Sequence, residues 1–225
     1  MRISKATINK TPYLGIYSVC TDNFCIVPLN ILKKEESILE KFLNTKIIKT
    51  SINDSPLIGV YLLAYGNKVV VCKNSIKKYE IELLEKNGIE VKIINEDYNA
   101  LGNLVSINKN HGFASPVLSD KTISEISSFF DIKVEKKELL SLDILGSILY
   151  ANDYLFIVNP SIDEKDFLFL KKKLKVEGVA TTLNYGGLFV GNDVIANKNA
   201  VLVGANTSNI EIMKVDDVVL MHTEL

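Results

Sequence analysis

The sequence has very little arginine, and this shortage limits what the chain can recognise. Among its 26 basic residues only Arg2 is an arginine, the side chain best suited to bidentate contacts with phosphate and guanine. The 26 basic residues are balanced by 27 acidic ones, for a formal charge of -1, so no overall field attracts nucleic acid. We therefore expect no autonomous DNA-binding function.

Long apolar runs are missing as well. No stretch approaches the ~18 apolar residues of a membrane span, and the residues that follow Met1 and Arg2 form no signal peptide. The three cysteines, Cys20, Cys25 and Cys72, are odd in number and lie in apolar runs without metal-ligand spacing. We expect a cytoplasmic protein with reduced thiols, no metal, no cofactor and no membrane partner.

What the sequence does contain is enough apolar residues for a large core. It has 225 residues, of which 47% are hydrophobic and 24% charged, as in an ordinary globular protein. Length alone leaves one large domain or two small ones open, so internal organisation must decide.

A glycine returns at nearly constant spacing after a short apolar lead-in. Subtracting residue numbers gives intervals of 44, 43, 44 and 45 residues. The five glycines are Gly15, Gly59, Gly102, Gly146 and Gly191. Self-similarity at a fixed period of this length indicates a repeat architecture.

Each glycine opens the same succession of patterns. A first run of strand character is followed by a polar turn and a second apolar run, which together predict a hairpin. The first runs are 16–20, 60–64, 104–107, 148–151 and 194–196, and the second runs are 24–27, 68–72, 112–114, 154–158 and 200–203. Four repeats continue with helical periodicity and then a third strand at 47–52, 89–94, 132–139 and 176–183. The predicted unit is strand, strand, helix, strand.

The two ends of the chain complement each other. Repeat five shows no convincing helix after Gly204, only the apolar stretch 210–220, whereas 2–9 forms an extra segment that could add a strand. A closed ring leaves only short sheet edges. We predict one α/β ring domain over 1–225, as a monomer, with repeats near 10–55, 56–98, 99–142, 143–187 and 188–225.

The repeat glycines have two interpretations. The simpler and favoured one is that positive φ or a close approach of neighbouring backbones excludes a Cβ. The other is that they line a ligand channel. Phosphate binding is not indicated, because no repeat contains a P-loop or a dinucleotide-binding glycine pattern.

A catalytic centre is not indicated either. Hydrolases that modify guanidino groups use cysteine, histidine and paired acids at the centre of such a ring, and we keep this enzyme class as the alternative function. The only histidines are His111 in the third hairpin turn, which we interpret as solvated, and His222 near the C-terminus, which we expect to be exposed. Cys20 and Cys72 resemble small buried apolar residues without a base to activate them.

The charged clusters have simple explanations. Acidic residues at 35–36 and 163–166 open predicted helices, where they complement the helix dipole, and those at 216–217 indicate a solvated face. Lysine pairs are spread over four repeats and alternate with acids, so we interpret them as solvated helix faces that would at most support an RNA contact.

Several strings resemble archaeal translation initiation factor 6, a family of ribosome anti-association factors. They are Asn99-Ala100-Leu101-Gly102-Asn103, Leu57-Ile58-Gly59, and Gly204-Ala205-Asn206-Thr207-Ser208 with Glu211. The resemblance covers the whole chain and implies the pentein fold, a ring of five units about a pseudo-five-fold axis. The short C-terminus resembles the archaeal, tail-free type.

The resemblance also implies a function without catalysis. Members bind the intersubunit face of the large ribosomal subunit, against an L14-type ribosomal protein near the sarcin-ricin loop, and block the small subunit. The implied binding surface is the ring end just after the repeat glycines. Its residues would be Asn103 first, then Val60, Tyr65, Ser147 and Asn192.

The chain departs from the family at several places. Val60 and Tyr65 stand where other members carry polar or basic residues, and Tyr185 replaces a cation in an Asn-basic-Gly string. The junction at 53–56 lacks the usual glycines, and Asn206 replaces an aspartate. These changes indicate a divergent interface. A structural scaffold for another complex is a further alternative.

Overall fold

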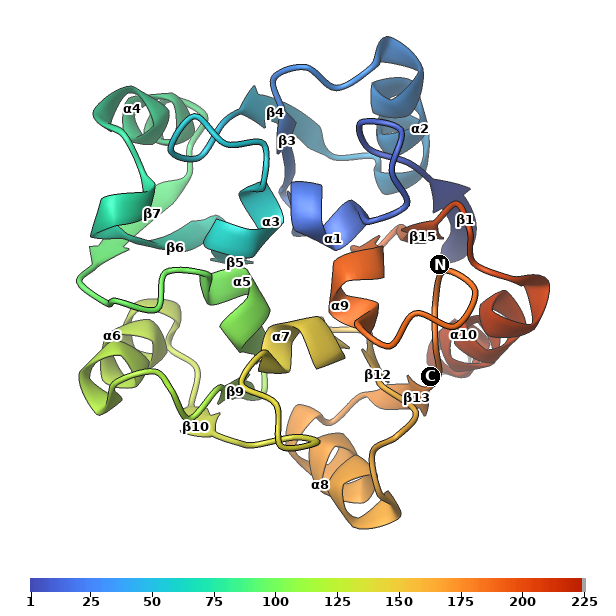
Figure 1. Ribbon diagram of the computed structural model, residues 1–225. Helices are drawn as coiled ribbons and strands as arrows, with labels where there is room; N and C mark the ends of the chain where they lie inside the picture. Colours follow the sequence, from blue (N-terminus) through green and yellow to red (C-terminus); the bar gives the residue numbers. More distant parts are fainter. Residues whose placement is uncertain (224–225) are drawn as a thin grey trace.

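The computed structural model describes the backbone of residues 1–223 and the side chains up to residue 221. Five three-stranded sheets are arranged around a central axis, each covered on the outside by a helix (Figure 1). The observed fold is therefore the predicted α/β ring of five units. No helix in the described part of the chain is long and apolar enough to cross a membrane.

Each sheet has the same strand order. An edge strand lines the axis, pairs antiparallel with a central strand, and the central strand pairs parallel with an outer one. The edge strands are β2 (Val19–Cys20), β5 (Leu63–Tyr65), β8 (Val105–Ile107), β11 (Leu149–Ala151) and β14 (Val194–Ala196). The central strands are β3 (Phe24–Pro28), β6 (Lys68–Cys72), β9 (Gly112–Ala114), β12 (Leu155–Val158) and β15 (Ala200–Gly204). The predicted hairpins are confirmed.

The outer strand of the fifth sheet comes from the other end of the chain. β1 (Arg2–Ala6) pairs parallel with β15 in the register Arg2 to Ala200, so the first and last segments share one sheet. The other outer strands are β4 (Lys46–Thr50), β7 (Glu90–Ile94), β10 (Val134–Lys136) and β13 (Glu177–Ala180). The N-terminal segment thus closes the ring, which leaves no gap between repeats five and one (Figure 1).

Long helices cover the outside of the sheets. They are α2 (Lys33–Leu43), α4 (Lys78–Lys86), α6 (Asp120–Phe130), α8 (Glu164–Leu174) and α10 (Asn209–Thr223), and a 3-10 turn, η1 (Lys73–Ser75), precedes α4. The first four confirm the predicted helical periodicity. The expectation that repeat five has no helix after Gly204 was wrong, because α10 forms there and is the longest helix of the described chain. Its apolar residues are spread around the helix, which hides the period of 3.6 residues.

A second correction concerns the repeat glycines. They do not begin strands but lie in one-turn helices, and the edge strand starts only three or four residues later. These helices are α1 (Leu14–Tyr17), α3 (Ile58–Tyr61), α5 (Leu101–Leu104), α7 (Leu145–Ile148) and α9 (Val190–Asp193), and they surround the axis in Figure 1. A single turn is too short for apolar periodicity to show it.

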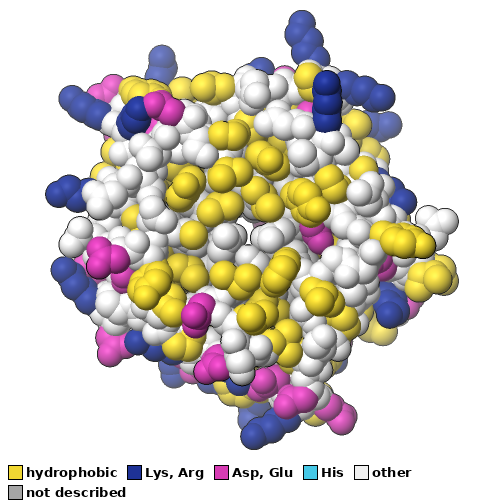
Figure 2. Space-filling view, in the orientation of Figure 1, with side chains coloured by type: hydrophobic (Ala, Val, Ile, Leu, Met, Phe, Trp, Pro, Cys, Tyr) yellow, Lys and Arg dark blue, Asp and Glu magenta, His cyan; other side chains and the backbone are white. Residues whose placement is uncertain are grey.

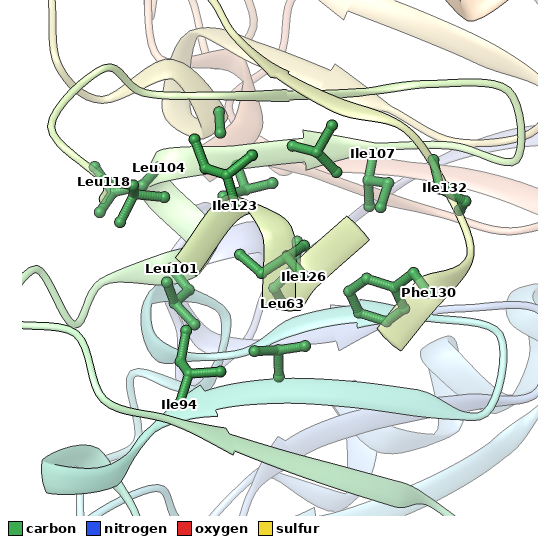
Figure 3. Packing of buried hydrophobic residues seen from close by; sticks show 14 of the residues in the cluster. Leu63, Ile94, Leu101, Leu104, Ile107, Leu118, Ile123, Ile126, Phe130 and Ile132 are labelled. Carbon is green, nitrogen blue, oxygen red and sulfur yellow. The ribbon is translucent and has the colours of Figure 1, made fainter. Parts of the chain in front are cut away.

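The apolar core is divided among the repeats but bridges them. In the cluster of Figure 3, Leu63 and Ile94 from the second sheet pack against Leu101, Ile126 and Phe130 from the next repeat. Four similar clusters fill the other seams. Each repeat therefore buries its apolar face only by contact with its neighbours, as expected of a repeat architecture.

Buried glutamates tie three of the seams together. Glu211 accepts hydrogen bonds from Thr182 Oγ1 (2.6 Å) and from the backbone N–H groups of Tyr185 (3.1 Å), Gly186 (2.9 Å) and Ser208 (2.7 Å). Glu35 and Glu80 bind the equivalent turns in the same way. These turns have left-handed backbones, as at Asn53 (φ 55°), so their N–H groups converge on one anion.

Candidate functional site

The five repeat glycines touch one another around the axis. A Cβ on any of them would lie well inside van der Waals contact of a backbone carbonyl of the preceding repeat; for Gly102 that atom is the Gly59 oxygen. None of the five has a left-handed backbone. Close approach, rather than positive φ, is therefore what requires glycine, as the favoured interpretation had it.

Four of the sequence-predicted binding residues occupy the position directly after a repeat glycine. Val60, Asn103, Ser147 and Asn192 lie in α3, α5, α7 and α9, and the repeat places them around the axis on one face of the ring. Ser147 is only 2% exposed and offers little surface to a partner. The other three are partly exposed.

Two of these residues carry unused hydrogen-bonding groups. Within the described part of the chain, the side-chain amides of Asn103 and Asn192 have no intramolecular hydrogen-bond partner, although their backbone N–H groups bind Ala100 and Phe189 (both 2.9 Å). The amides of Asn108 and Asn197, in contrast, cap helix carbonyls of neighbouring repeats. A partly exposed amide that the fold does not use is available to a partner.

Tyr65 belongs to the opposite end of the ring. It ends β5, and its hydroxyl donates to Asp153 Oδ2 at 3.1 Å. Burial, together with the charge of Asp153, raises the pKa of Tyr65. The structure therefore does not bring Tyr65 together with the other four predicted site residues.

The face that carries the one-turn helices is largely apolar near the axis, and its lysines lie at the rim (Figure 2). The loops that lead into α1, α7 and α9 expose large apolar side chains: Tyr13 (47%), Leu142 (38%), Leu188 (45%), Phe189 (42%) and Tyr185 (84%). Apart from Tyr185, sequence reasoning missed them. The apolar lead-in to each repeat glycine could have predicted these exposed side chains, but it was interpreted only as part of the repeat.

A buried acid lies beside Asn192. Asp193 is 2% exposed, and burial raises its pKa to about 6, with a small addition from the charge of Glu211 and a partial offset by a hydrogen bond from Asn184. Asp193 therefore stays largely ionised at neutral pH and becomes protonated as the pH falls through about 6.

A cavity of about 370 Å³ lies on the axis, with the repeat glycines at one end and the hairpin turns at the other. The five edge strands form its wall. Two hydrogen bonds cross its mouth: Tyr154 donates to Asp22 at 2.5 Å, and Tyr65 donates to Asp153. The glycines thus also line a cavity, and a ligand channel at this place stays a prediction.

The cavity does not activate the cysteine in its lining. Cys20 lines it, but contact with Cys25, followed by burial, raises the pKa of the Cys20 thiol. Burial raises the pKa of Cys72 to about 12. No histidine belongs to the described lining, and no group of three metal-ligating side chains occurs among the described residues.

His111 is not the solvated turn residue that the sequence suggested. It is 5% exposed, and its ring lies against that of Phe113 with the centroids 4.9 Å apart and the planes tilted by 54°. Its Nε2 lies 3.2 Å from Glu135 Oε1, although no hydrogen bond is aligned there. Burial lowers its pKa. The hairpin turn packs against α8 of the next repeat, where Asn108 binds the Leu174 carbonyl at 2.9 Å. The side chain of His222 lies outside the described residues.

The architecture defines the class of protein. Five units around an axis of glycines form a pentein-type ring, and the N-terminal domain of ArgZ, solved with a covalently bound reaction intermediate, has the same fold (TM-score 0.50, 14% identity, 82% of this chain and 74% of that chain). The family model described as the eIF-6 family matches residues 3–218. The chain belongs to the eIF-6 family.

Two curated relatives cover nearly the whole chain. Translation initiation factor 6 of Picrophilus torridus is 30% identical over 215 residues, 96% of this chain and 98% of the relative. The protein of the same name from Pyrococcus horikoshii is 28% identical over 223 residues, again 96% and 98%. The resemblance that the short motifs suggested is confirmed.

Proposed function

We propose that this protein is a translation initiation factor that binds the intersubunit face of the large ribosomal subunit and prevents premature association with the small subunit. Membership of the eIF-6 family, along residues 3–218, is the observation that carries the proposal. The expected partners are an L14-type ribosomal protein and the rRNA near the sarcin-ricin loop. The factor acts in the cytoplasm as a monomer.

The ring face with the one-turn helices is the docking surface that we propose. It combines exposed apolar side chains with the free amides of Asn103 and Asn192, a mixture of apolar anchors and hydrogen-bonding groups that suits a protein interface of ~800 Å² per partner. Lysines at its rim (Figure 2) suit rRNA phosphates at the edge of the contact.

The mechanism requires no catalysis. The contacts of the glycines around the axis and the pairing of β1 with β15 make the ring a rigid body, and a rigid body bound at the intersubunit face excludes the small subunit by its volume. The raised pKa of the Cys20 and Cys72 thiols disfavours the alternative, a hydrolase that attacks a guanidino carbon through a thiolate.

Co-sedimentation with purified archaeal ribosomal subunits tests the proposal. We expect the protein to sediment with large subunits only, and its addition to a mixture of both subunits to reduce the fraction of joined ribosomes. Binding to neither subunit would contradict the proposal and favour a scaffold for another complex. Rapid labelling of one cysteine at neutral pH would favour the hydrolase.

Asn103→Ala locates the site. Because the amide has no partner within the described chain, its loss should leave the ring folded and weaken large-subunit binding about tenfold, the effect of ~1.4 kcal/mol in a central interface hydrogen bond. Asn67→Ala is the matched control, since Asn67 is exposed in the β5–β6 turn at the opposite end of the ring. Equal binding by both variants would remove this face from the interface.

A further inference from the structure

Two thiols face each other in the first hairpin. Cys20 in β2 and Cys25 in β3 are direct partners in the antiparallel register, and both are free thiols. Directly opposed side chains project from the same face of a sheet. Cys20 accordingly packs against the apolar cluster that contains Cys25.

The hydrogen-bond pattern of the hairpin sets the distance between the two strands at this point. The N–H of Thr21 donates to the carbonyl of Phe24 at 2.9 Å, so these two residues form the hydrogen-bonded pair next to the turn. Pairs alternate along an antiparallel ladder, which makes Cys20 and Cys25 a non-hydrogen-bonded pair with Cα atoms about 4.5 Å apart. A disulfide spans about 4.4–6.8 Å between Cα atoms.

The equivalent pairs in the other four repeats show that packing does not require thiols here. A small residue opposes a larger one in each, and none is a cysteine. These pairs are Ala64 with Val69, Ile107 with Gly112, Ala151 with Phe156, and Ala196 with Val201. The first repeat alone places two side chains of the same size and chemistry at this position.

The central cavity gives an oxidant a route to one of the two thiols. Cys20 lines the cavity and is partly exposed, whereas Cys25 is fully buried behind it. Cys72, the third cysteine, is fully buried in a different core cluster. Oxidation should therefore begin at Cys20 and be completed by Cys25.

We propose that Cys20 and Cys25 are a redox modification site that closes to an intramolecular disulfide under oxidising conditions. With hydrogen peroxide as oxidant, the Cys20 sulfur attacks one peroxide oxygen, giving a sulfenic acid and water. The Cys25 sulfur then attacks the Cys20 sulfur, forming the S–S bond and releasing a second water. Two thiols and one peroxide become one disulfide and two waters.

The surroundings set the rate and the consequence of this reaction. Contact with Cys25, burial and the charge of Asp22 raise the pKa of Cys20, so little thiolate is present at neutral pH and the reaction is slow. The turn between the two cysteines carries Asp22, which accepts hydrogen bonds from Tyr154 and from the backbone N–H of Lys198 (2.7 Å). The disulfide would fix the base of this turn and, with it, one side of the cavity mouth.

Thiol counting on the full-length folded protein tests the proposal. After treatment with hydrogen peroxide, the protein is denatured and alkylated, and its mass is measured. We expect a monomer in which one alkylated cysteine, Cys72, remains and in which the chain has lost about 2 Da, the two hydrogen atoms of the thiols. Dithiothreitol should restore three alkylated cysteines.

Single substitutions assign the bond. Cys72→Ser should still lose two alkylation sites. Cys20→Ser should lose none, whereas Cys25→Ser should lose at most one, because the oxidised Cys20 sulfur then has no thiol to resolve it, and neither variant should give a disulfide. Three alkylated cysteines in oxidised wild type, a disulfide that includes Cys72, or a sulfinic acid on Cys20 with Cys25 still alkylated would each overturn the proposal. If the substitution at the buried Cys25 prevents folding, the wild-type and Cys72→Ser measurements still test whether Cys20 and Cys25 form the disulfide.

Discussion

At the end of the ring formed by the one-turn helices, all five repeats carry the same residue, glycine, whereas at the end formed by the hairpin turns the repeats differ. Seven residues after the repeat glycine, the turns contain Asp22, Gly66, Lys109, Asp153 and Lys198. The glycines pack backbone against backbone, which leaves no room for a Cβ. The turns are joined through side chains, and several different pairs can meet that requirement.

The N-termini of the five long outer helices are less uniform than the glycines and more uniform than the hairpin turns. Their third residues are Glu35, Glu80, Thr122, Asp166 and Glu211. Among the described residues, only the three glutamates bind the backbone of a turn that follows an outer strand, β1, β4 or β13. Asp166, one methylene shorter, instead pairs with Lys137 at 2.6 Å. The comparison indicates that a contact is repeated in all five units only when the geometry leaves no alternative.

Gly102→Ala should give the largest effect. Its Cβ would collide with the carbonyl of Gly59, which belongs to the fixed backbone of the neighbouring helix. Because the ring is closed, the displacement cannot be absorbed at a free end. We expect a loss of more than about 3 kcal/mol in the free energy of unfolding, measured by urea denaturation.

Gly88→Ala is the matched control for that substitution. Gly88 has φ +86°, and no atom lies within 4 Å of the position that a Cβ would take, so only backbone strain of about 1 kcal/mol is expected. Equal costs for the two variants would mean that contact between glycines is not what fixes the residue at the axis.

Glu211→Gln should give an intermediate effect. The carboxylate accepts four hydrogen bonds that hold the turn before α9, and burial of an amide donor against those N–H groups should cost about 2–3 kcal/mol. Despite the opposing effect of burial, hydrogen bonds from Thr182, Ser208 and Gly186 lower the pKa of Glu211 to about 2. A lowered pKa in the folded state stabilises the protein above the unfolded value of 4.5.

The pH dependence separates that contribution from simple packing. The advantage of wild type over Glu211→Gln should be complete above pH 4.5 and disappear as the pH falls to about 2. Glu82→Gln, an exposed glutamate on α4 with a surface ion pair, is the control and should change little. A pH-independent difference would show that the charge of Glu211 contributes nothing.

The ring could be predicted from the sequence because the close approach of the backbones at the axis requires a glycine in every repeat. A glycine that must recur in every repeat produces a regular spacing, and the hairpins and four helices beside it have strong local patterns. The one-turn helices and α10 were not predicted, because their sequences show no local pattern. Four residues are too few for a helical period, and a helix with apolar residues all round shows none.

The candidate site could be predicted only in part. The position after each glycine follows from the repeat, so the common face of Val60, Asn103 and Asn192 could be predicted, and their role in binding stays a prediction. Local sequence does not reveal that Ser147 is buried. Tyr65 and His111 were misplaced because their environments come from elsewhere in the fold, Asp153 for Tyr65 and Glu135 with α8 for His111. Sequence periodicity carries no information on such contacts.

Tyr154→Phe should give the smallest effect, because it removes one side-chain hydrogen bond at the variable end of the ring. Asp22 loses the hydroxyl at 2.5 Å but keeps the backbone N–H of Lys198 at 2.7 Å, so we expect a cost of about 1 kcal/mol in urea denaturation. Tyr98→Phe, at a residue that is 54% exposed, should change nothing measurable. A loss as large as that of Glu211→Gln would mean that the cross-ring bond is as indispensable as the glutamate, and that sequence variation among the turns does not indicate a weaker structural requirement.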